Sequence, residues 1–368
     1  MATYRKRGNK WEYRIREKDL VGDEPISGGG FSTKSEARAV ATQIENDLRM
    51  GLNRDNGEML FSDYYDRWMN AYKIGVFSEV TDEEYLFVSR LIKSNFKNVK
   101  LKDVTKLMYQ NFLNEYSEGK AKATVQKTHK RIAPCLREAF ANRHVSVDVT
   151  HNVVFRGLDS QKESEKYLNL HEAEKLTKAL LDGLNNSTVT RYMAVLQLAT
   201  GMRVGEVMAL QFKDIDFLHN QISINKKWDY KFTNDFAPTK NKESRTIAID
   251  KDTLKIIRPF YDYQMNQKVQ DHKQRLFASK RTVPSVDAVN GMLQRACKRA
   301  GIQRVTSHAL RHTHASMLIL EGAPVPYISE RLGHKSITIT LETYSHVLDE
   351  LKDKGDKEVL RIVSGLYK

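Results

Sequence analysis

The chain has 368 residues, 40% of them hydrophobic, which is enough for two or three domains with cores of their own. Its 60 lysines and arginines outnumber its 46 aspartates and glutamates, and the net charge of +14 suits a polyanionic partner. With only two cysteines, Cys135 and Cys297, the sequence excludes a disulfide framework and a paired-cysteine metal site. It has no apolar run long enough to cross a bilayer and no secretory signal, so we expect a reducing compartment and no membrane partner.

An N-terminal module of strands followed by one helix is predicted first. Residues 11–16 alternate between apolar and polar, which predicts a half-buried strand, and the glycines at 28–30 predict a turn. Thr33 and Glu36 form a capping box that opens a helix to about Leu48. A basic sheet face can enter the major groove of DNA, and the alternative is an oligomerisation or solubility module. The candidate DNA contacts here are Arg5, Lys6, Arg7, Lys10, Arg14 and Arg16.

Helical patterns dominate the next hundred or so residues. The aromatic residues within 61–72 recur at helical spacing, and we interpret them as a core rather than as a platform for stacked bases. Thr81 and Glu84 predict the start of a second helix, and Thr105 predicts the cap of a third.

A fourth helix is predicted at 123–142, where Pro134 predicts a kink or an interruption. Basic residues crowd around the start of this helix. A charge run is usually a solvated face, but a DNA-facing surface is at least as well supported here. These further candidate DNA contacts are Lys120, Lys122, Lys127, Lys130 and Arg131.

A polar, charged stretch predicts a linker before a C-terminal domain. Asn169 and Glu172 form a capping box at the start of that domain, and residues 221–226 and 244–249 predict a β-hairpin within it. The fold class is therefore mainly α with small β elements. The predicted parts are an N-terminal DNA-binding module at 1–55, a helical domain at 60–156, a linker at 157–166 and a mostly helical domain with a C-terminal tail at 167–368.

Arg203 lies between two predicted helices, one ending at Gly201 and the next beginning near Val204. Its planar guanidinium can hold two phosphate oxygens, which a lysine cannot copy. Glu206 lies three residues on and can orient it. The alternative is an ordinary surface ion pair.

His308 and Arg311 are three residues apart, so they share one helical face and can reach one phosphate. His308, His312 and His314 offer a rival histidine metal site. No glutamate lies between them and no cysteine is near, so we place metal well behind phosphate. His312 and His314 are predicted to be structural.

Lys240 lies between the two predicted strands. A lysine at a hairpin tip can reach into a site and protonate a leaving oxygen. Lys242 fits the same role, and an exposed hairpin lysine is the alternative for both. The pattern leaves the choice between Lys240 and Lys242 open.

His334 follows Gly333, which is predicted to end one helix, while Ser336 can cap the next. Tyr344 comes ten residues later. A phenol with a pKa of about 10 is a poor nucleophile at neutral pH and needs nearby positive charge or a base. A lone tyrosine is more often a core residue, but this set of arginines, lysine and histidines can bind a phosphate and activate a phenol.

These motifs together resemble the tyrosine recombinase family, specifically the integrases of phages and conjugative elements. The resemblance covers residues 167–350, and the motifs come in the family's order. The preceding helical domain resembles the core-binding domain of the family, and the first 55 residues resemble its arm-binding domain. The motifs are Thr200-Gly201-Met202-Arg203-x-x-Glu206, His308-x-x-Arg311-His312, Leu332-Gly333-His334 and Tyr344-Ser345-His346-Val347.

The resemblance implies a role for each motif residue. Tyr344 attacks the scissile phosphodiester and forms a 3′-phosphotyrosyl link. His308 assists proton transfer from the tyrosine, and Lys240 protonates the leaving 5′ oxygen. Arg203 and Arg311 clamp the non-bridging oxygens. His334 hydrogen-bonds the phosphate, and neither a metal nor ATP is required.

The same resemblance implies the partners. They are double-stranded DNA with core-type and arm-type attachment sites, a homotetramer assembled on that DNA, and a possible host DNA-bending protein and excision factor. We expect the cytoplasm of a bacterial host, and affinity for DNA that falls steeply with salt. The apolar tail beyond about residue 349 is expected to pack on a neighbouring protomer.

Three other functions remain open at this point. A type IB topoisomerase would share the chemistry without strand exchange, although the N-terminal module argues against it. A non-catalytic DNA-binding regulator would not need the complete residue set. A histidine-metal hydrolase would lose activity on chelation.

Overall fold

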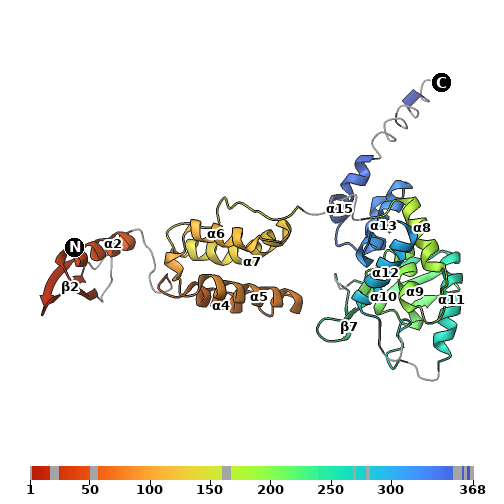
Figure 1. The fold of residues 1–368 in the computed structure, drawn as a ribbon, viewed down its shortest axis with the longest axis horizontal. Helices are drawn as coiled ribbons and strands as arrows, with labels where there is room; N and C mark the ends of the chain where they lie inside the picture. Colours follow the sequence, from red (N-terminus) through yellow and green to blue (C-terminus); the bar gives the residue numbers. More distant parts are fainter. Residues whose placement is uncertain are drawn as a thin grey trace. The chain divides into compact units, whose positions relative to one another are not determined.

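The computed structural model divides the chain into two compact units, Met1–Ser160 and Gln161–Lys368, and each is described by itself (Figure 1). In the part that the structure describes, no helix is both long enough and apolar enough to cross a membrane. The domain boundaries predicted from the sequence stay predictions. The structure describes residues 2–16, 25–49, 57–159, 167–239, 241, 243–267, 271–278, 282–350, 359 and 363–364.

The N-terminal module is a three-stranded antiparallel sheet, in the order β1–β2–β3, with one helix packed on one face. Tyr13 and Ile15 of the sheet form a small core with Ala41 and Ile44 of the helix. The predicted capping box is confirmed, since the Glu36 backbone N–H donates to Thr33 Oγ1 at 3.1 Å. The elements are β1 (Thr3–Arg7), β2 (Lys10–Ile15), β3 (Ile26–Phe31) and α2 (Lys34–Arg49).

The glycines predicted to form a turn lie instead within strand β3. Gly28 pairs with Tyr13 of β2, and a Cβ atom on Gly28 would lie 2.7 Å from the Tyr13 hydroxyl oxygen. The glycine is therefore needed because a tyrosine ring from the neighbouring strand covers it, and the turn prediction was wrong for that reason.

The helical block of the first unit has one aromatic core, as the sequence predicts. Phe61, Tyr65 and Trp68 are buried in it, whereas Tyr72 at the end of the same helix is exposed. Trp68 Nε1 donates to the Glu138 carboxylate at 2.7 Å, which satisfies its polar atom. The elements are α4 (Phe61–Tyr72), α5 (Glu79–Phe96), the short 3₁₀ helix η1 (Leu101–Asp103), α6 (Lys106–Tyr116) and α7 (Lys122–Ala141).

Of the helix details predicted for this block, the start at Thr81 is wrong, the interruption at Pro134 is not found, and the cap at Thr105 is confirmed. Helix α5 begins at Glu79 after an extended Ser78, so Thr81 lies inside the first turn, where its hydroxyl meets Ser78 Oγ at 3.2 Å. Helix α7 continues through Pro134 without interruption. Thr105 caps α6 as predicted, accepting from the Met108 N–H at 3.1 Å.

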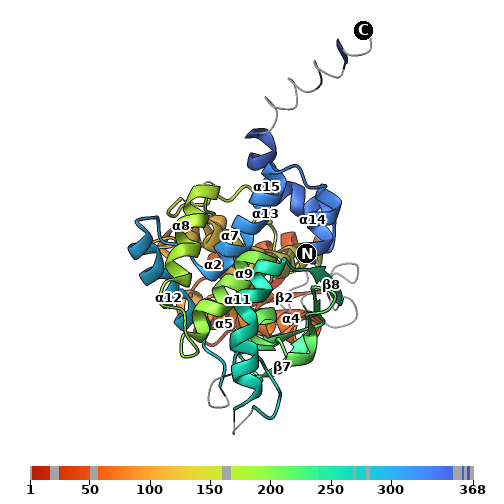
Figure 2. The same cartoon turned by 90° about the vertical axis from the view of Figure 1, so that its right-hand side faces the viewer.

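The second unit is built around α9, which is buried on almost every side and contacts α8, α10, α11, α12 and α13 (Figure 2). A helix that is apolar all round requires such a shell of neighbours. The predicted capping box of Asn169 and Glu172 starts α8. The helices are α8 (Leu170–Leu181), α9 (Val189–Thr200), α10 (Val204–Met208), η3 (Phe212–Asp214), α11 (Lys251–Met265), α12 (Val286–Ala300), α13 (Ser307–Leu320), α14 (Val325–Leu332) and α15 (Ile337–Glu350).

Two small antiparallel sheets complete this unit. The predicted pairing of 221–226 with 244–249 is confirmed in β5 and β8, where Ile222 lies opposite Ile247. A second hairpin between them was not predicted, and it is held by Trp228 and Phe236, whose rings meet edge to face. The strands are β4 (Ile215–Asp216), β5 (Gln221–Ile224), β6 (Lys226–Asp229), β7 (Asp235–Pro238) and β8 (Arg245–Ala248). The mainly α fold with small β elements is therefore confirmed.

Candidate active site

The turn between α9 and α10 places Arg203 at a pocket. Gly201 ends α9 in the left-handed region at φ 70°, which a glycine adopts without strain. A Cβ atom at this position would lie 2.6 Å from His314 Cδ2 and 2.8 Å from Leu332 Cδ2, so α13 and α14 pack directly on the turn. Arg203 follows as the half-buried N-cap of α10.

Glu206 holds Arg203 and a second arginine that the sequence analysis missed, Arg245 of β8. The carboxylate of Glu206 is buried and lies 3.0 Å from Arg203 Nη1 and 2.7 Å from Arg245 Nη2. Burial alone raises the pKa of Glu206, but the hydrogen bond and charge of Arg245 and the charge of Arg203 bring it below its usual value. Glu206 is therefore a carboxylate that fixes two guanidinium groups.

Arg311 on α13 is almost fully buried, with 2% of its surface exposed. Its Nη1 donates to the Gly201 carbonyl at 2.8 Å and its Nη2 donates to the Leu332 carbonyl at 2.7 Å. Burial, and then the charge of Arg203, lowers the pKa of Arg311 to about 9. A bound anion would offset both effects, so this buried cation is suited to a phosphate.

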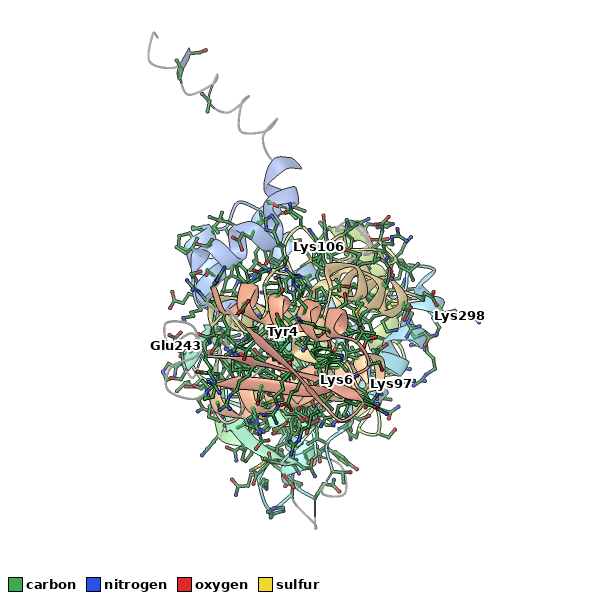
Figure 3. The ribbon with its side chains drawn as sticks, turned by 90° about the vertical axis from the view of Figure 1, so that its left-hand side faces the viewer. Tyr4, Lys6, Lys97, Lys106, Glu243 and Lys298 are labelled. Carbon is green, nitrogen blue, oxygen red and sulfur yellow. The ribbon has the colours of Figure 1, made fainter. Side chains whose placement is uncertain are left out.

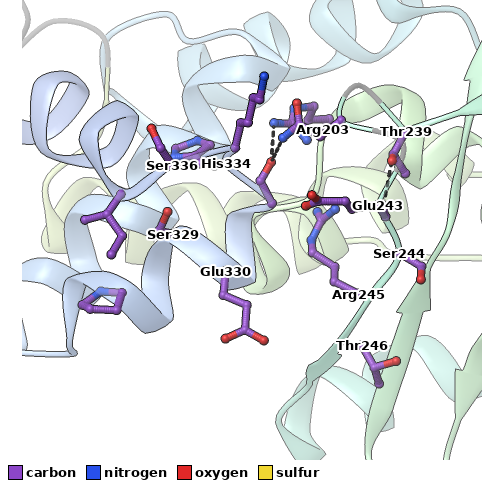
Figure 4. Close-up of a pocket in the computed structure, with 15 residues that line it drawn as sticks. Arg203, Thr239, Glu243, Ser244, Arg245, Thr246, Ser329, Glu330, His334 and Ser336 are labelled. Atoms are coloured by element: carbon purple, nitrogen blue, oxygen red, sulfur yellow. Dashed lines mark hydrogen bonds between the residues drawn. The ribbon is translucent and has the colours of Figure 1, made fainter.

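The C-terminal end of α14 gathers the arginines of the site, of which Figure 4 labels Arg203 and Arg245. Three consecutive carbonyl oxygens there accept hydrogen bonds from the guanidinium or amide groups of four residues elsewhere in the chain. Cations are favoured at this end of a helix. Arg245 Nε donates to Arg331 at 2.8 Å, Arg311 Nη2 to Leu332 at 2.7 Å, and Arg203 Nη2 and Asn241 Nδ2 to Gly333 at 3.0 Å each.

His334 follows directly, in the bend between α14 and α15. Its Nδ1 lies 2.8 Å from Thr340 Oγ1. Burial, followed by the charges of Arg311 and Arg203, lowers the pKa of His334 to about 3, so the ring is neutral at physiological pH. When Nδ1 accepts from Thr340, Nε2 carries the proton and can donate to a phosphate oxygen.

Tyr344 lies inside α15, at a residue whose backbone leaves helical geometry with φ −117° and ψ 19°. Its side chain is buried, with 1% exposed. Burial raises the pKa of Tyr344 to about 12, and the charge of Arg311 offsets only part of this effect. The phenol is therefore held neutral until something removes its proton.

The two histidines predicted to be structural have different positions. His314 is structural, since it is buried with Nδ1 2.9 Å from the Leu198 carbonyl and accepts from Arg331 Nε at 3.0 Å. His312 instead lies in the site, with Nδ1 3.1 Å from the Tyr344 hydroxyl. The structural interpretation of His312 was wrong because helical spacing does not show which neighbour a side chain meets.

A pocket of about 200 Å³ brings five of the six predicted catalytic residues together. Among the described residues, no three His, Cys, Asp or Glu side chains are grouped so that they could hold a metal ion. A second, polar pocket of about 600 Å³ adjoins this site and shares Arg203 and His334 with it (Figure 4). The smaller pocket is lined by Arg203, Asn241, His308, Arg311, His312, His334, Lys335, Ile339, Thr343 and Tyr344.

Lys240 and Lys242 both lie outside the described residues. Their neighbours are described, and Thr239 Oγ1 donates to the Glu243 carbonyl at 2.7 Å across the turn. Asn241, between the two lysines, reaches the Gly333 carbonyl. The β7–β8 turn thus ends at the active-site pocket, and the general acid remains a choice between the two lysines.

The N-terminal cations divide between the two faces of the sheet. By strand alternation, Tyr4 and Lys6 of β1, which are labelled in Figure 3, lie on the face of the sheet toward α2. Glu12 lies on the opposite, open face and pairs with Arg5 at 3.1 Å. Arg16 is exposed just beyond β2. The cations of the open face are Arg5, Arg7, Lys10 and Arg14.

The cations near the start of α7 also differ. Lys127 and Arg131 both bind the Glu84 carboxylate, at 2.5 and 2.7 Å. Lys120 lies over the Tyr116 ring, with its Nζ 4.6 Å from the ring centre. Intramolecular partners therefore already engage three of these five candidates. The exposed ones are Lys122, Lys127 and Lys130.

Comparison with known proteins identifies the family. Residues 166–350 match the model described as the phage integrase family, and residues 60–117 match the phage integrase N-terminal SAM-like domain. The chain is 24% identical over 349 residues to a tyrosine recombinase XerC-like protein of Caldanaerobacter subterraneus, covering 87% of this chain and 88% of the relative. It is 25% identical over 356 residues to the integrase of Staphylococcus phage L54a, covering 87% of this chain and 99% of the relative.

A solved structure shows the same fold. It is the integrase of the transposon Tn1549 in complex with a circular intermediate DNA, with a TM-score of 0.67 and 18% identity over 83% of this chain and 99% of that chain. The family model covers half of this chain, and the motif residues of that half line one pocket. The chain therefore belongs to the phage integrase family and is a tyrosine recombinase, an enzyme that cleaves and rejoins DNA strands at specific sites.

Proposed function

We propose that this recombinase integrates and excises a mobile element, such as a prophage or a conjugative transposon, and that Tyr344 is its nucleophile. The observation that carries the proposal is the single pocket that Arg203, Arg311 and His334 line together with Tyr344. Three donors able to hold a phosphate lie beside a phenol able to attack it. The product of that attack is a 3′-phosphotyrosyl link that keeps the energy of the phosphodiester for rejoining.

The two arginines bind the non-bridging oxygens of the scissile phosphate. Arg203 and Arg311 now donate to the carbonyls of Gly333, Gly201 and Leu332. These contacts hold the guanidinium groups in place before DNA arrives, which is the preorganisation that electrostatic catalysis requires. His334 Nε2 donates a further hydrogen bond. Fixed cations therefore neutralise the charge of the transition state.

The remaining roles concern protons. Lys240 is our candidate for the acid that protonates the leaving 5′ oxygen, with Lys242 as the alternative. The described residue between the two lysines supports either assignment, since Asn241 hydrogen-bonds to the carbonyl just before His334. His308 is exposed at the pocket and is proposed to assist proton transfer from Tyr344.

Double-stranded DNA is the proposed partner, with core-type sites bound by the helical block and the catalytic domain and arm-type sites bound by the N-terminal sheet. The open face of that sheet supports the second part, because Arg5, Arg7, Lys10 and Arg14 lie on it beside a glycine-rich strand that adds little bulk. We also propose a homotetramer on DNA, an excision factor, a host bending protein and a place in the bacterial cytoplasm. The tail predicted to bind a neighbouring protomer lies largely outside the described residues.

The test is DNA cleavage in EDTA on a suicide substrate, whose nick lets the cut strand diffuse away and traps the covalent complex. We expect an adduct that survives denaturation with the wild type and none with Tyr344→Phe. Tyr263→Phe, on α11 away from the pocket, is the matched control and keeps wild-type yield. Joining of two different duplexes distinguishes a recombinase from a topoisomerase, and tight binding without any adduct at several junctions would favour a regulator.

A further inference from the structure

His312 lies in direct contact with Tyr344, the proposed nucleophile. The Nδ1 atom of His312 lies 3.1 Å from the Tyr344 hydroxyl oxygen, within hydrogen-bonding distance, and the two ring centres are 5.6 Å apart. The same α13 helix carries Arg311 on one side of His312 and the buried Thr313 and His314 on the other. The buried residues on either side of His312 therefore fix the position of its backbone in the helix.

His308 and His312 occupy different depths of the pocket. They are one helical turn apart, with ring centres 4.6 Å apart and the rings nearly perpendicular at 85°. His308 is exposed and His312 is half-buried. The edge-to-face contact orients the His312 ring, and His308 occupies the more exposed of the two positions.

Tyr344 needs a proton acceptor in contact with it. Its phenol is buried, and burial raises its pKa to about 12. Arg311 contributes in the opposite direction, but the net shift still opposes ionisation. A neutral imidazole at hydrogen-bonding distance can take the proton as the phenol attacks.

We propose that His312 Nδ1 receives the phenol proton of Tyr344 during strand cleavage and returns it during rejoining. The inference rests on the proposed function, with Tyr344 as nucleophile. As the proton moves to Nδ1, the Tyr344 oxygen forms a bond to phosphorus and the bond from phosphorus to the 5′ oxygen breaks. The 5′ oxygen takes a proton from the general acid. His312 begins as the tautomer with its proton on Nε2 and becomes an imidazolium beside the newly formed phosphotyrosine.

The test replaces His312 with asparagine, whose side-chain oxygen can still accept a hydrogen bond but cannot take the proton. We expect cleavage of the suicide substrate to slow by about 100-fold or more, the usual contribution of a general base. A substrate with sulfur in place of the bridging 5′ oxygen has a leaving group that needs no proton. The defect of His312→Asn persists on it, whereas that of a general-acid variant, Lys240→Ala or Lys242→Ala, is relieved.

A second measurement separates proton transfer from a purely structural role. A fluorinated tyrosine in place of Tyr344 has a phenol of lower pKa. Its ionisation therefore depends less on a base that takes the proton. The defect of His312→Asn should then shrink at least several-fold. The comparison variant is His308→Asn, whose residue is proposed only to assist this transfer, and the fluorotyrosine should relieve its defect less than that of His312→Asn.

Wild-type adduct formation is the check on the proposed function and is made first, so that its failure is distinct from failure of this proposal. Melting temperature and DNA affinity exclude misfolding, and His312→Gln serves if the asparagine variant does not fold. The proposal is overturned if His312→Asn cleaves at the wild-type rate, or if sulfur substitution restores it. It is equally overturned if the fluorotyrosine relieves His308→Asn and not His312→Asn.

Discussion

At the residue scale, Glu206 is the most consequential side chain that never touches the reacting phosphate in this account. It is buried and lies between Arg203 and Arg245, and its carboxylate accepts from both. Arg245 continues to the Arg331 carbonyl, so the carboxylate connects α10, β8 and the end of α14. Removing one charge from such a group leaves the others uncompensated, which is costly in a buried site.

Glu206→Gln should therefore lower the free energy of unfolding by about 3 kcal/mol, the lower end of the cost of breaking a buried ion pair. Strand cleavage should fall further than stability explains, because Arg203 loses its anchor. Urea denaturation and adduct yield at a temperature where the variant is folded measure the two effects. Glu321→Gln, an exposed residue at the end of α13, is the control and should change neither. An adduct yield equal to wild type would contradict the orienting role.

His314 predicts how stability depends on pH. Burial, followed by the charge of Arg331, lowers its pKa from 6.5 to about 3 in the folded chain. Above pH 6.5 His314 is neutral in both the folded and the unfolded chain. Below pH 6.5 the unfolded chain binds a proton at this histidine, whereas the folded chain does not. Its contribution to stability is thus lost as pH falls from about 6.5 toward 3, by up to about 1.4 kcal/mol per pH unit.

The test is urea denaturation of the wild type and of His314→Gln at pH 7 and at pH 5.5. These two pH values lie on either side of the usual histidine pKa of about 6.5. The variant should be less stable at both, since the imidazole no longer bonds to the Leu198 carbonyl, but its stability should change less between them. His272→Gln, at an exposed position, keeps the wild-type slope. Equal slopes in all three proteins would contradict a buried neutral His314.

Sequence reasoning at this scale found the residues whose motif is local. Arg203, His308, Arg311, His334 and Tyr344 each stood in a short pattern that carried its own physical argument. Arg245, Asn241 and His312 were missed. Arg245 meets Glu206 across 39 residues, and Asn241 meets the Gly333 carbonyl across 92. The signal for His312 was present in its position beside Arg311, but only the fold shows which ring it meets.

At the scale of elements, the α9–α10 turn determines where Arg203 lies in the site. Gly201 has φ 70° and faces His314 and Leu332, whereas Gly301 at the end of α12 has φ 65° and nothing within 4 Å of its missing Cβ. The two glycines end helices in the same conformation. They differ only in what a side chain would meet.

Gly301→Ala should therefore cost about 1 kcal/mol, the strain of an alanine in the left-handed region. Gly201→Ala should cost that amount and about 1–3 kcal/mol more for overpacking, and should displace Arg203 and lower cleavage. Urea denaturation of both variants and an adduct assay make the comparison. Equal losses of stability in the two variants, with normal cleavage in Gly201→Ala, would contradict the close packing around this turn.

Elements were predictable where their ends are encoded nearby. The capping residues Thr33, Thr105 and Asn169 identified three helix starts, because each cap and its partner lie within three residues. Gly28 of β3 was misread because the ring that covers it belongs to Tyr13 of β2. The β6–β7 hairpin was missed because its aromatic pair places one residue in each strand, Trp228 and Phe236. A single aromatic residue in a strand does not produce the alternating pattern that predicts one.

At the scale of the whole molecule, excess positive charge and the family's chemistry together predict salt-dependent DNA binding. Removing one side chain that binds a phosphate lowers the slope of log affinity against log salt by about 1. Arg7→Ala and Arg14→Ala, on the open face of the N-terminal sheet, should each do this for arm-type DNA and leave core-type binding unchanged. Lys255→Ala, an exposed cation paired with Asp252, is the control.

Anisotropy titrations on the two DNA types, over a range of salt, make this measurement. An unchanged slope in both sheet variants would remove the N-terminal module from DNA binding and favour an oligomerisation role. Composition indicated a basic, multidomain chain, but it could not divide the cations by face. That division depends on strand alternation and on intramolecular partners such as Glu84, which engages Lys127 and Arg131.

The central claim is that Tyr344 becomes covalently joined to DNA. The most direct measurement traps the suicide-substrate adduct in EDTA, digests protein and DNA, and locates the attached nucleotide by mass spectrometry. The tryptic peptide 336–352 contains Tyr344 as its single tyrosine, so the assignment is unambiguous. The account predicts a nucleotide 3′-phosphate on Tyr344. A nucleotide attached to any other residue would contradict it, as would an adduct that Tyr344→Phe still forms.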